Sequence, residues 1–218
     1  MTETSPIDTS TTLSAHSSTV RRRLLVAALL CGFAAIGAWL AMPAAVRGDV
    51  RGAAPVLRVE LDSPIHPMAS RFVDKVLGEA AERGAAAVVI ELNTPGGSLP
   101  ATRRLCQAFL ASEVPVIVYV SPGGAQAASA GFFLLMAADV AAMAPGTNTG
   151  SAHPVTGSGE DIQGAMGEKV LEDALALVRS LAEQRGRDLE VVQAAVSESR
   201  SMTATEAFDA GIVDAVAA

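Results

Sequence analysis

Two hydrophobic periodicities alternate along most of this chain, one typical of strands and one typical of helices. Val56–Leu61 alternates apolar with polar residues, as a half-buried strand does. Nearly continuous apolar runs, typical of buried parallel strands, cover residues 86–92, 114–120 and 140–143. Apolar residues at helical spacing predict helices over 68–83, 100–112 and 168–183, and the apolar run 127–138 predicts a buried helix. This alternation predicts βαβ units and an α/β layered domain over residues 55–218.

The second half of this domain contains a long connection and a clearly marked final helix. Residues 144–167 are rich in Gly, Pro, Ser and Thr. Connections of this length inside a compact domain are usually functional or mobile. Thr203–Glu206 has the form of a capping box that opens a final helix, and Gly211 ends that helix.

The N-terminal part contains an uncharged apolar run over residues 24–46. A polar tail, residues 1–23, precedes it and ends in Arg21–Arg23, and a short linker, residues 47–54, follows it. As a helix the run would be roughly 34 Å long, enough to cross a bilayer core of roughly 30 Å. Two interpretations stay open: a transmembrane anchor and a cleaved signal peptide. The run has no good small-x-small cleavage site, which favours the anchor.

The arginines before the apolar run predict a cytoplasmic N-terminus and a single-pass membrane protein whose domain lies on the extracytoplasmic side. Cleavage of the run would instead release a secreted or periplasmic domain. The whole chain carries a net charge of −7. Four of its 16 basic residues flank the apolar run and so lie outside the domain, which is therefore clearly acidic. An acidic domain disfavours nucleic acid as a partner.

Cysteine and histidine are scarce, which limits the metal chemistry and redox chemistry of the domain. Cys31 lies in the apolar run, and Cys106 is the one cysteine beyond it, so an internal disulfide of the domain is excluded. No Cys/His cluster has the spacing of a metal site, and we expect neither a metal nor an organic cofactor.

Two segments carry candidate chemistry. Thr94–Gly97 follows a predicted buried strand and opens a helix, where glycine N–H groups can point into a cleft and stabilise an oxyanion. Ser129 lies among small residues, which leave room for a substrate carbonyl, and the Ala130 N–H lies near the free end of a predicted helix. Singly, an ordinary strand-to-helix turn and a helix-entry serine explain these segments as well. Together they favour a serine hydrolase.

Five segments, in the same order along the chain, carry a resemblance to a known family. They are residues 89–97 (VIELNTPGG), 115–122 (PVIVYVSP), 127–131 (AASAG), 143–148 (MAPGTN) and 203–214 (TATEAFDAGIVD). Residues 55–216 resemble the membrane-bound ClpP-class serine proteases of the NfeD family.

The resemblance implies a ClpP/crotonase-like spiral of βαβ units and an endopeptidase that cleaves hydrophobic peptide or membrane-protein segments. It also implies a Ser-Lys dyad and a homodimer or larger homo-oligomer. Matched residue by residue, Ser129 is the nucleophile, the N–H groups of Gly97 and Ala130 form the oxyanion hole, and Lys169 is the base.

The residue chemistry supports Lys169 as the base and leaves His153 as an alternative. The chain has only two lysines, Lys75 and Lys169, and a lysine amine can be made neutral where an arginine cannot. His153 lies 24 positions after Ser129, close to where soluble ClpP proteases carry their triad histidine. No acidic partner for His153 can be chosen from the sequence, which weakens a Ser-His-Asp triad.

Two functions of other classes stay open. The first is a catalytically inactive membrane scaffold that keeps the fold and binds a hydrophobic segment of a partner. The second is acyl-CoA chemistry of the crotonase type on the same fold. Turnover separates the scaffold from an enzyme, and binding of a CoA thioester separates the crotonase-type enzyme from a protease.

Overall fold

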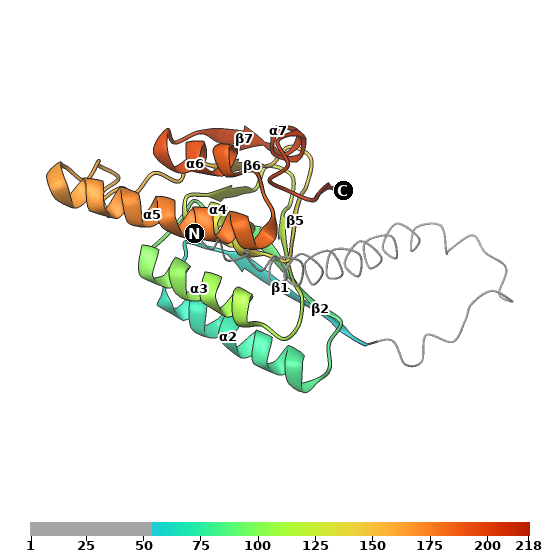
Figure 1. The fold of residues 1–218 in the computed structure, drawn as a ribbon. Coiled ribbons are helices and arrows are strands. Elements are labelled where there is room, and N and C mark those ends of the chain that lie inside the picture. Colours follow the sequence, from blue (N-terminus) through green and yellow to red (C-terminus); the bar gives the residue numbers. More distant parts are fainter. Residues whose placement is uncertain (1–53) are drawn as a thin grey trace, which may run out of the picture. The chain divides into compact units, whose positions relative to one another are not determined.

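A parallel sheet runs through the part of the chain that this computed structural model describes, residues 54–218 (Figure 1). Val59, Ile90 and Val118 are paired across three neighbouring strands, and all three are buried. This row confirms that the apolar runs are core strands. The five strands, in spatial order, are β1 (Val56–Asp62), β2 (Ala87–Asn93), β3 (Val116–Val120), β5 (Val140–Met143) and β8 (Ala215–Val216).

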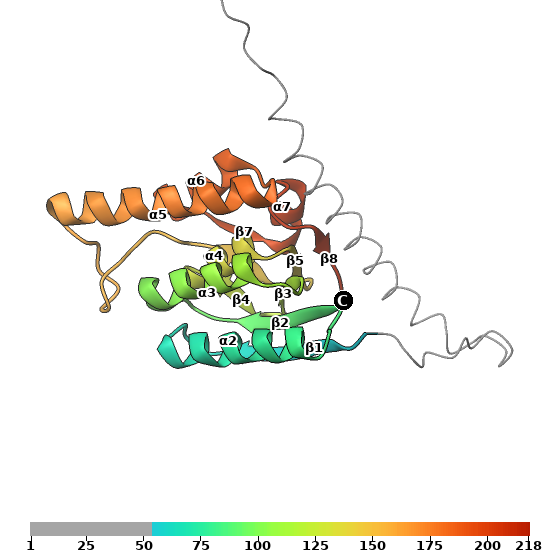
Figure 2. The same ribbon diagram turned by 60° about the horizontal axis from the view of Figure 1, so that its bottom comes forward.

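Helices connect these strands and pack against one another in sequence order. In Figures 1 and 2, α2 lies beside α3, and α3 packs on α4, which packs on α5. The N-terminal end of α5 extends beyond the rest of the described part (Figure 1). The helices are α2 (Pro67–Glu82), α3 (Leu99–Ala111), α4 (Ala130–Ala137), α5 (Gly164–Arg185), α6 (Leu189–Ser197) and α7 (Ala204–Asp209).

A second, three-stranded sheet lies beside the start of α4. It consists of β4 (Gln126–Ala128), β6 (Asn148–Gly150) and β7 (Ser201–Thr203). The predicted helix 127–138 is therefore wrong for its first residues, because Ala127 pairs with Thr149 in this sheet. A short run of alanines has no periodicity that separates strand from helix, so pairing decides. Ser129 consequently lies between a strand and a helix.

The helix that carries Lys169 begins earlier than its sequence predicts. α5 starts at Gly164, so Lys169 lies on its second turn. The two glycines at 164 and 167 disfavour a helix by propensity. Gly167 packs so closely on Ile162 that an added Cβ would lie 1.8 Å from the Ile162 carbonyl oxygen. Because a helix dipole acts mainly within the first turn, Lys169 lies beyond most of its influence.

The predicted capping box at the final helix is confirmed. The Thr203 hydroxyl accepts a hydrogen bond from the Glu206 N–H, and the Glu206 carboxylate accepts one from the Thr203 N–H at 2.8 Å. The bonds from the Thr203 N–H and then from its hydroxyl lower the pKa of Glu206 below its usual value. The box fixes the chain direction between β7 and α7.

The predicted anchor or signal peptide, residues 24–46, lies outside the described residues. Among residues 54–218, no helix combines the length with the apolar character that crossing a membrane requires.

Candidate active site

Ser129 occupies the sharp turn that joins β4 to α4. Its backbone has φ 51° and ψ −112°, a conformation that residues other than glycine rarely adopt. The Ser129 N–H donates to the Gly150 carbonyl at 2.9 Å, which holds this turn against β6. Its hydroxyl makes no capping hydrogen bond to α4. A serine on a strained strand-to-helix turn is also how the nucleophile of α/β-hydrolases is presented.

The loop after β2 lies against this serine. Gly96 has φ 133°, and a Cβ added to it would lie 2.9 Å from the Ser129 Cβ and 3.3 Å from its Oγ. On the other side, a Cβ on Gly97 would lie 2.2 Å from the Ile65 carbonyl oxygen. The Ile65 N–H donates to the Gly96 carbonyl at 2.8 Å, and the Ser98 N–H donates to the Ile65 carbonyl at 2.9 Å. Glycine is therefore required at both positions, because the backbone passes between two close neighbours.

Two backbone N–H groups stay available beside the Ser129 hydroxyl. Within residues 54–218, neither the Gly97 N–H nor the Ala130 N–H donates a hydrogen bond. Ala130 is the first residue of α4, whose N-terminus also carries positive potential. A serine hydroxyl and unpaired backbone N–H donors near it are what acyl transfer needs for its tetrahedral oxyanion.

Ser129, Gly97 and Ala130 line one cavity of ≈ 630 Å³. The structure thus brings together three of the four residues predicted for the Ser-Lys site. None of the residues that line this cavity within the described part carries a charge. Its apolar walls come from α3, α4, the 152–162 segment and α5, and they include Leu99, Phe133, Val155, Ile162 and Val170.

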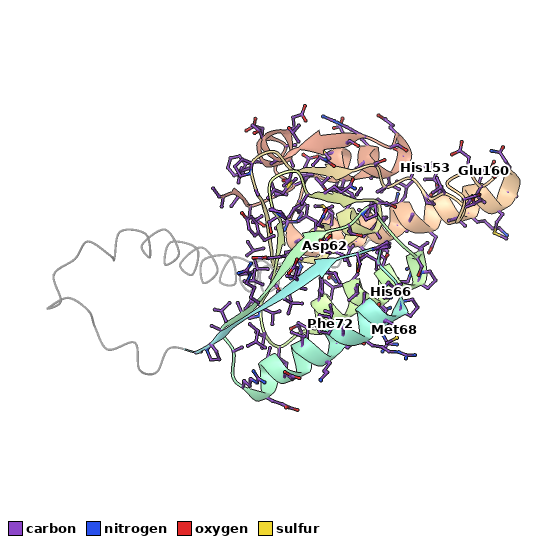
Figure 3. The ribbon with its side chains drawn as sticks, turned by 180° about the vertical axis from the view of Figure 1, so that it is seen from behind. Asp62, His66, Met68, Phe72, His153 and Glu160 are labelled. Carbon is purple, nitrogen blue, oxygen red and sulfur yellow. The ribbon has the colours of Figure 1, made fainter. Side chains whose placement is uncertain are left out.

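The two candidate bases do not line this cavity. Lys169 is exposed, although its neighbour Val170 faces the cavity, and it forms no ion pair with any residue of 54–218. The His153 ring is half-buried, and its Nδ1 lies 3.1 Å from the Val196 carbonyl oxygen on α6. A carbonyl can only accept, so Nδ1 carries the hydrogen in this bond. Figure 3 shows His153 on the segment that leads to α5.

Cys106 is not a second nucleophile. Its thiol is buried on α3, and burial raises its pKa to about 12. The reactive form of cysteine is the thiolate, which is scarce near neutral pH when the pKa is that high. Residues 54–218 also contain no group of His, Cys, Asp and Glu side chains that could hold a metal ion.

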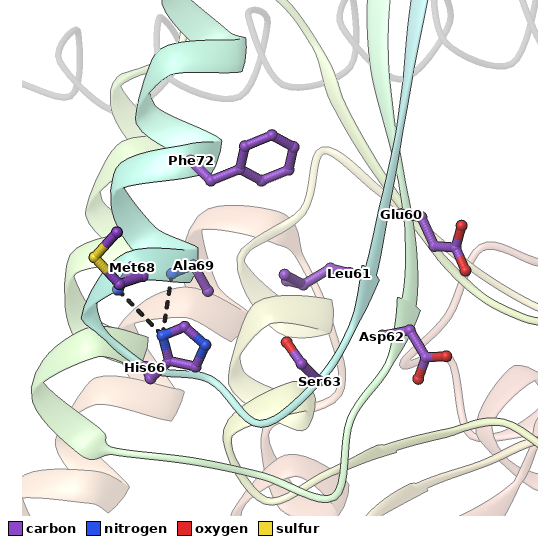
Figure 4. Close-up of a pocket in the computed structure, with 8 residues that line it drawn as sticks. All are labelled: Glu60, Leu61, Asp62, Ser63, His66, Met68, Ala69 and Phe72. Carbon is purple, nitrogen blue, oxygen red and sulfur yellow. Dashed lines mark hydrogen bonds between the residues drawn. The ribbon is translucent and has the colours of Figure 1, made fainter.

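A second cavity, of ≈ 510 Å³, lies between the end of β1 and the start of α2 (Figure 4). His66 lines it and caps α2, because its Nδ1 accepts from the N–H groups of Met68 at 3.2 Å and Ala69 at 3.4 Å. Sequence patterns do not reveal this role, since Ser, Thr, Asp and Asn are the usual capping residues. This cavity shares no lining residue with the Ser129 cavity.

Comparisons with known proteins find related sequences. The family model for the NfeD1b N-terminal domain matches residues 55–213. The membrane-bound protease PH1510 of Pyrococcus horikoshii is 35% identical over 147 residues, which are 66% of this chain and 33% of that protein. The membrane protein NfeD1b of Bacillus subtilis is 32% identical over 117 residues, 54% of this chain and 25% of that protein. The chain thus spans a third or less of the length of these relatives.

Solved structures show the same fold. A mutant of the 1510-N membrane-bound stomatin-specific protease, with serine changed to alanine, has a TM-score of 0.71 at 31% identity, covering 76% of this chain and 81% of that chain. A second mutant, with lysine changed to alanine and a substrate peptide bound, has a TM-score of 0.72 at 31% identity, covering 76% of each chain. ClpP1 from Listeria monocytogenes, at 22% identity and a TM-score of 0.60, covers 73% of this chain and 90% of that chain. The fold is therefore ClpP-like.

Proposed function

Because the chain belongs to the family of NfeD1b N-terminal domains and is a homologue of a membrane-bound protease, we propose that it is a serine endopeptidase. One observation carries the proposal. Ser129 stands on a strained turn at the wall of a cavity, and Gly97 and Ala130, whose N–H groups are unpaired within residues 54–218, line the same cavity. That combination serves acyl transfer and has no evident structural use.

In the proposed reaction a base takes the proton of the Ser129 hydroxyl while Oγ attacks the peptide carbonyl. The carbonyl oxygen becomes an oxyanion, which accepts hydrogen bonds from the Gly97 and Ala130 N–H groups. The protonated base then gives its proton to the leaving amine, and the C–N bond breaks to leave an acyl-enzyme. Water attacks the ester, the base accepts and returns the proton, and Ser129 is regenerated.

The cavity walls support a substrate with apolar side chains. A charged side chain entering this cavity would lose its hydration without gaining a partner of opposite charge, because the lining residues carry no charge. Leu99, Phe133 and Val170 offer apolar contact instead. We therefore assign hydrophobic peptide segments as the substrate class.

Lys169 is the base in this proposal. A lysine was mutated in the peptide-bound structure of the 1510-N protease, and Lys169 is one of only two lysines in this chain. The four-carbon side chain of Lys169 is flexible, and the adjacent residue on α5, Val170, already lines the cavity. The Lys169 amine can therefore turn toward the cavity. A lysine amine can lose its proton and an arginine cannot, which makes lysine the basic residue type that can act as a base.

The choice of base is tested by replacing Lys169, His153 and Lys75 one at a time with alanine. Lys75 is the matched control, since it is an exposed lysine on α2 that pairs only with Glu79. We expect Lys169→Ala to lower kcat/KM for a hydrophobic peptide by about 10²- to 10⁴-fold. Lys169→Arg should not restore activity, because arginine does not lose its proton. We expect His153→Ala and Lys75→Ala to keep kcat/KM within about threefold of the wild-type value. Loss of a base, in contrast, lowers kcat/KM by at least about 10²-fold.

The opposite pattern, an inactive His153→Ala beside an active Lys169→Ala, would transfer the role to His153. In that case the Val196 carbonyl orients the ring, and Nε2 takes the proton.

We further propose the organisation of the whole chain. Residues 1–23 form a cytoplasmic tail, residues 24–46 a single-pass anchor, residues 47–54 a linker and residues 55–218 the extracytoplasmic protease domain, which acts as a homodimer or larger homo-oligomer. The relatives described as membrane-bound and as a membrane protein support the tether. A protein recovered free of membranes, with an intact mass that lacks the apolar run, would instead establish signal cleavage.

A further inference from the structure

Thr94 lies between the two elements that supply the proposed oxyanion donors. It follows β2 directly, and its side chain is fully buried, with a relative exposure of 0%. Its Oγ1 donates to the Gly96 carbonyl at 3.0 Å and accepts from the Gly96 N–H at 3.2 Å. A buried hydroxyl normally has a hydrogen-bond partner, and threonine often finds it in the backbone of neighbouring residues. Here both of its bonds go to the loop that carries Gly97.

These bonds set the direction of the Gly97 N–H. The Gly96 carbonyl and the Gly97 N–H belong to one planar trans peptide, so they point in opposite directions. Thr94 Oγ1 and the Ile65 N–H both donate to that carbonyl, at 3.0 and 2.8 Å. With the carbonyl held by two donors on the protein side, the Gly97 N–H is directed away from them and toward the cavity that Gly97 lines.

The same residue also supports the second donor. The Thr94 backbone donates to the Gln126 carbonyl at 2.7 Å and accepts from the Ala128 N–H at 3.1 Å, so it brackets Ala127 of β4. Ser129 and Ala130 follow this strand at once. The Thr94 methyl packs on the first turn of α4, since a Cβ added to Gly131 would lie 2.6 Å from Cγ2.

We propose that Thr94 is a positioning residue that holds both halves of the oxyanion hole in register. Its hydroxyl orients the Gly97 N–H, and its backbone fixes the strand β4 that leads to Ala130. This inference rests on the proposed peptidase function. The hydroxyl carries the positioning role of the side chain and the methyl only packs on α4, so substitution can separate the two.

The test uses Thr94→Val and Thr94→Ser in the full-length protein, with kcat and KM measured on a hydrophobic peptide. Valine keeps the shape but removes both hydrogen bonds and places a methyl against the Gly96 carbonyl. We expect it to lower kcat by about 10- to 100-fold, somewhat less than complete loss of one oxyanion donor. Because the donors act on the transition state, KM should change by less than about threefold. Thr94→Ser keeps the hydroxyl and should retain kcat within about threefold of the wild type.

A packing role predicts the reverse order, with serine worse than valine, and that order would overturn the inference. Wild-type kcat in Thr94→Val would overturn it as well. If Thr94→Val does not fold, Thr94→Ser and Thr94→Ala replace the pair, since both lack the methyl and differ only in the hydroxyl. Equal kcat values for these two would then refute the assignment. A wild-type protein without any hydrolysis removes the peptidase proposal itself, and the Thr94 inference falls with it.

Discussion

Replacement of Ser129 by alanine is expected to abolish peptide hydrolysis. Loss of a serine nucleophile lowers kcat by on the order of 10⁴- to 10⁶-fold, because neither the base nor the oxyanion hole can then act on a bound intermediate. The free energy of unfolding should change by less than about 0.5 kcal/mol, as is usual where no packing or hydrogen bond is lost. The Ser129 hydroxyl makes no capping bond to α4. Alanine and serine both carry a Cβ, so the positive φ strains the backbone about equally in the two proteins.

The matched control is Ser197→Ala. Ser197 is an exposed serine on α6 whose hydroxyl bonds the Gln193 carbonyl, and it does not line the Ser129 cavity. Its replacement should leave kcat/KM unchanged. The peptidase assignment is wrong if Ser129→Ala hydrolyses a hydrophobic peptide at the rate of Ser197→Ala while both proteins show the same thermal unfolding curve.

Gly97→Ala is expected to damage both stability and activity. The new Cβ would lie 2.2 Å from the Ile65 carbonyl oxygen and 2.5 Å from the Ile65 nitrogen, which are backbone atoms that cannot rotate away. The bridge between Ile65 and Gly97 must therefore open. Overpacking of this kind costs about 1–3 kcal/mol of unfolding free energy, and backbone clashes lie at the upper end. Displacement of the Gly97 N–H should lower kcat by a further 10²- to 10³-fold or so.

Gly78→Ala provides the control for this prediction. Gly78 lies in the middle of α2, and a Cβ there would meet no atom within 4 Å. The same substitution should raise the free energy of unfolding by about 0.5–1 kcal/mol, because alanine favours a helix more than glycine does. Urea unfolding of both variants measures the contrast. A Gly97→Ala protein as stable and as active as the wild type would contradict the close packing of the loop on Ile65.

The sequence predicts that Ser129, Gly97 and Ala130 belong to one site, and in the structure all three line one cavity. Gly97 follows the end of a predicted strand closely, and parallel strands bring such ends to one edge of a sheet. The strand β4 could not be predicted, since its residue Ala127 pairs with Thr149 and Thr94 only in the folded chain. The backbone strain at Ser129 follows from that pairing, so the sequence does not reveal it either.

The base end of the site depends on contacts between distant segments, which a pattern does not encode. The His153 ring bonds the Val196 carbonyl, 43 positions away in the sequence. Lys169 was expected at a helix start and lies one turn further along, because Gly167 packs on Ile162 in a way that propensity opposes. Thr94 belongs to the recognised motif, yet its role follows only from the two bonds that its buried hydroxyl makes to Gly96.

The most direct test of the account is the site of covalent modification by a fluorophosphonate. In this reaction the serine oxygen displaces fluoride from phosphorus, and the phosphonyl oxygen takes the place of the oxyanion. The full-length protein, extracted in detergent, is treated with the probe, digested and mapped by mass spectrometry. The account predicts one adduct per chain, on Ser129, and none in Ser129→Ala. An adduct on another serine, or an unmodified protein at probe concentrations that label a known serine protease in the same buffer, would contradict it.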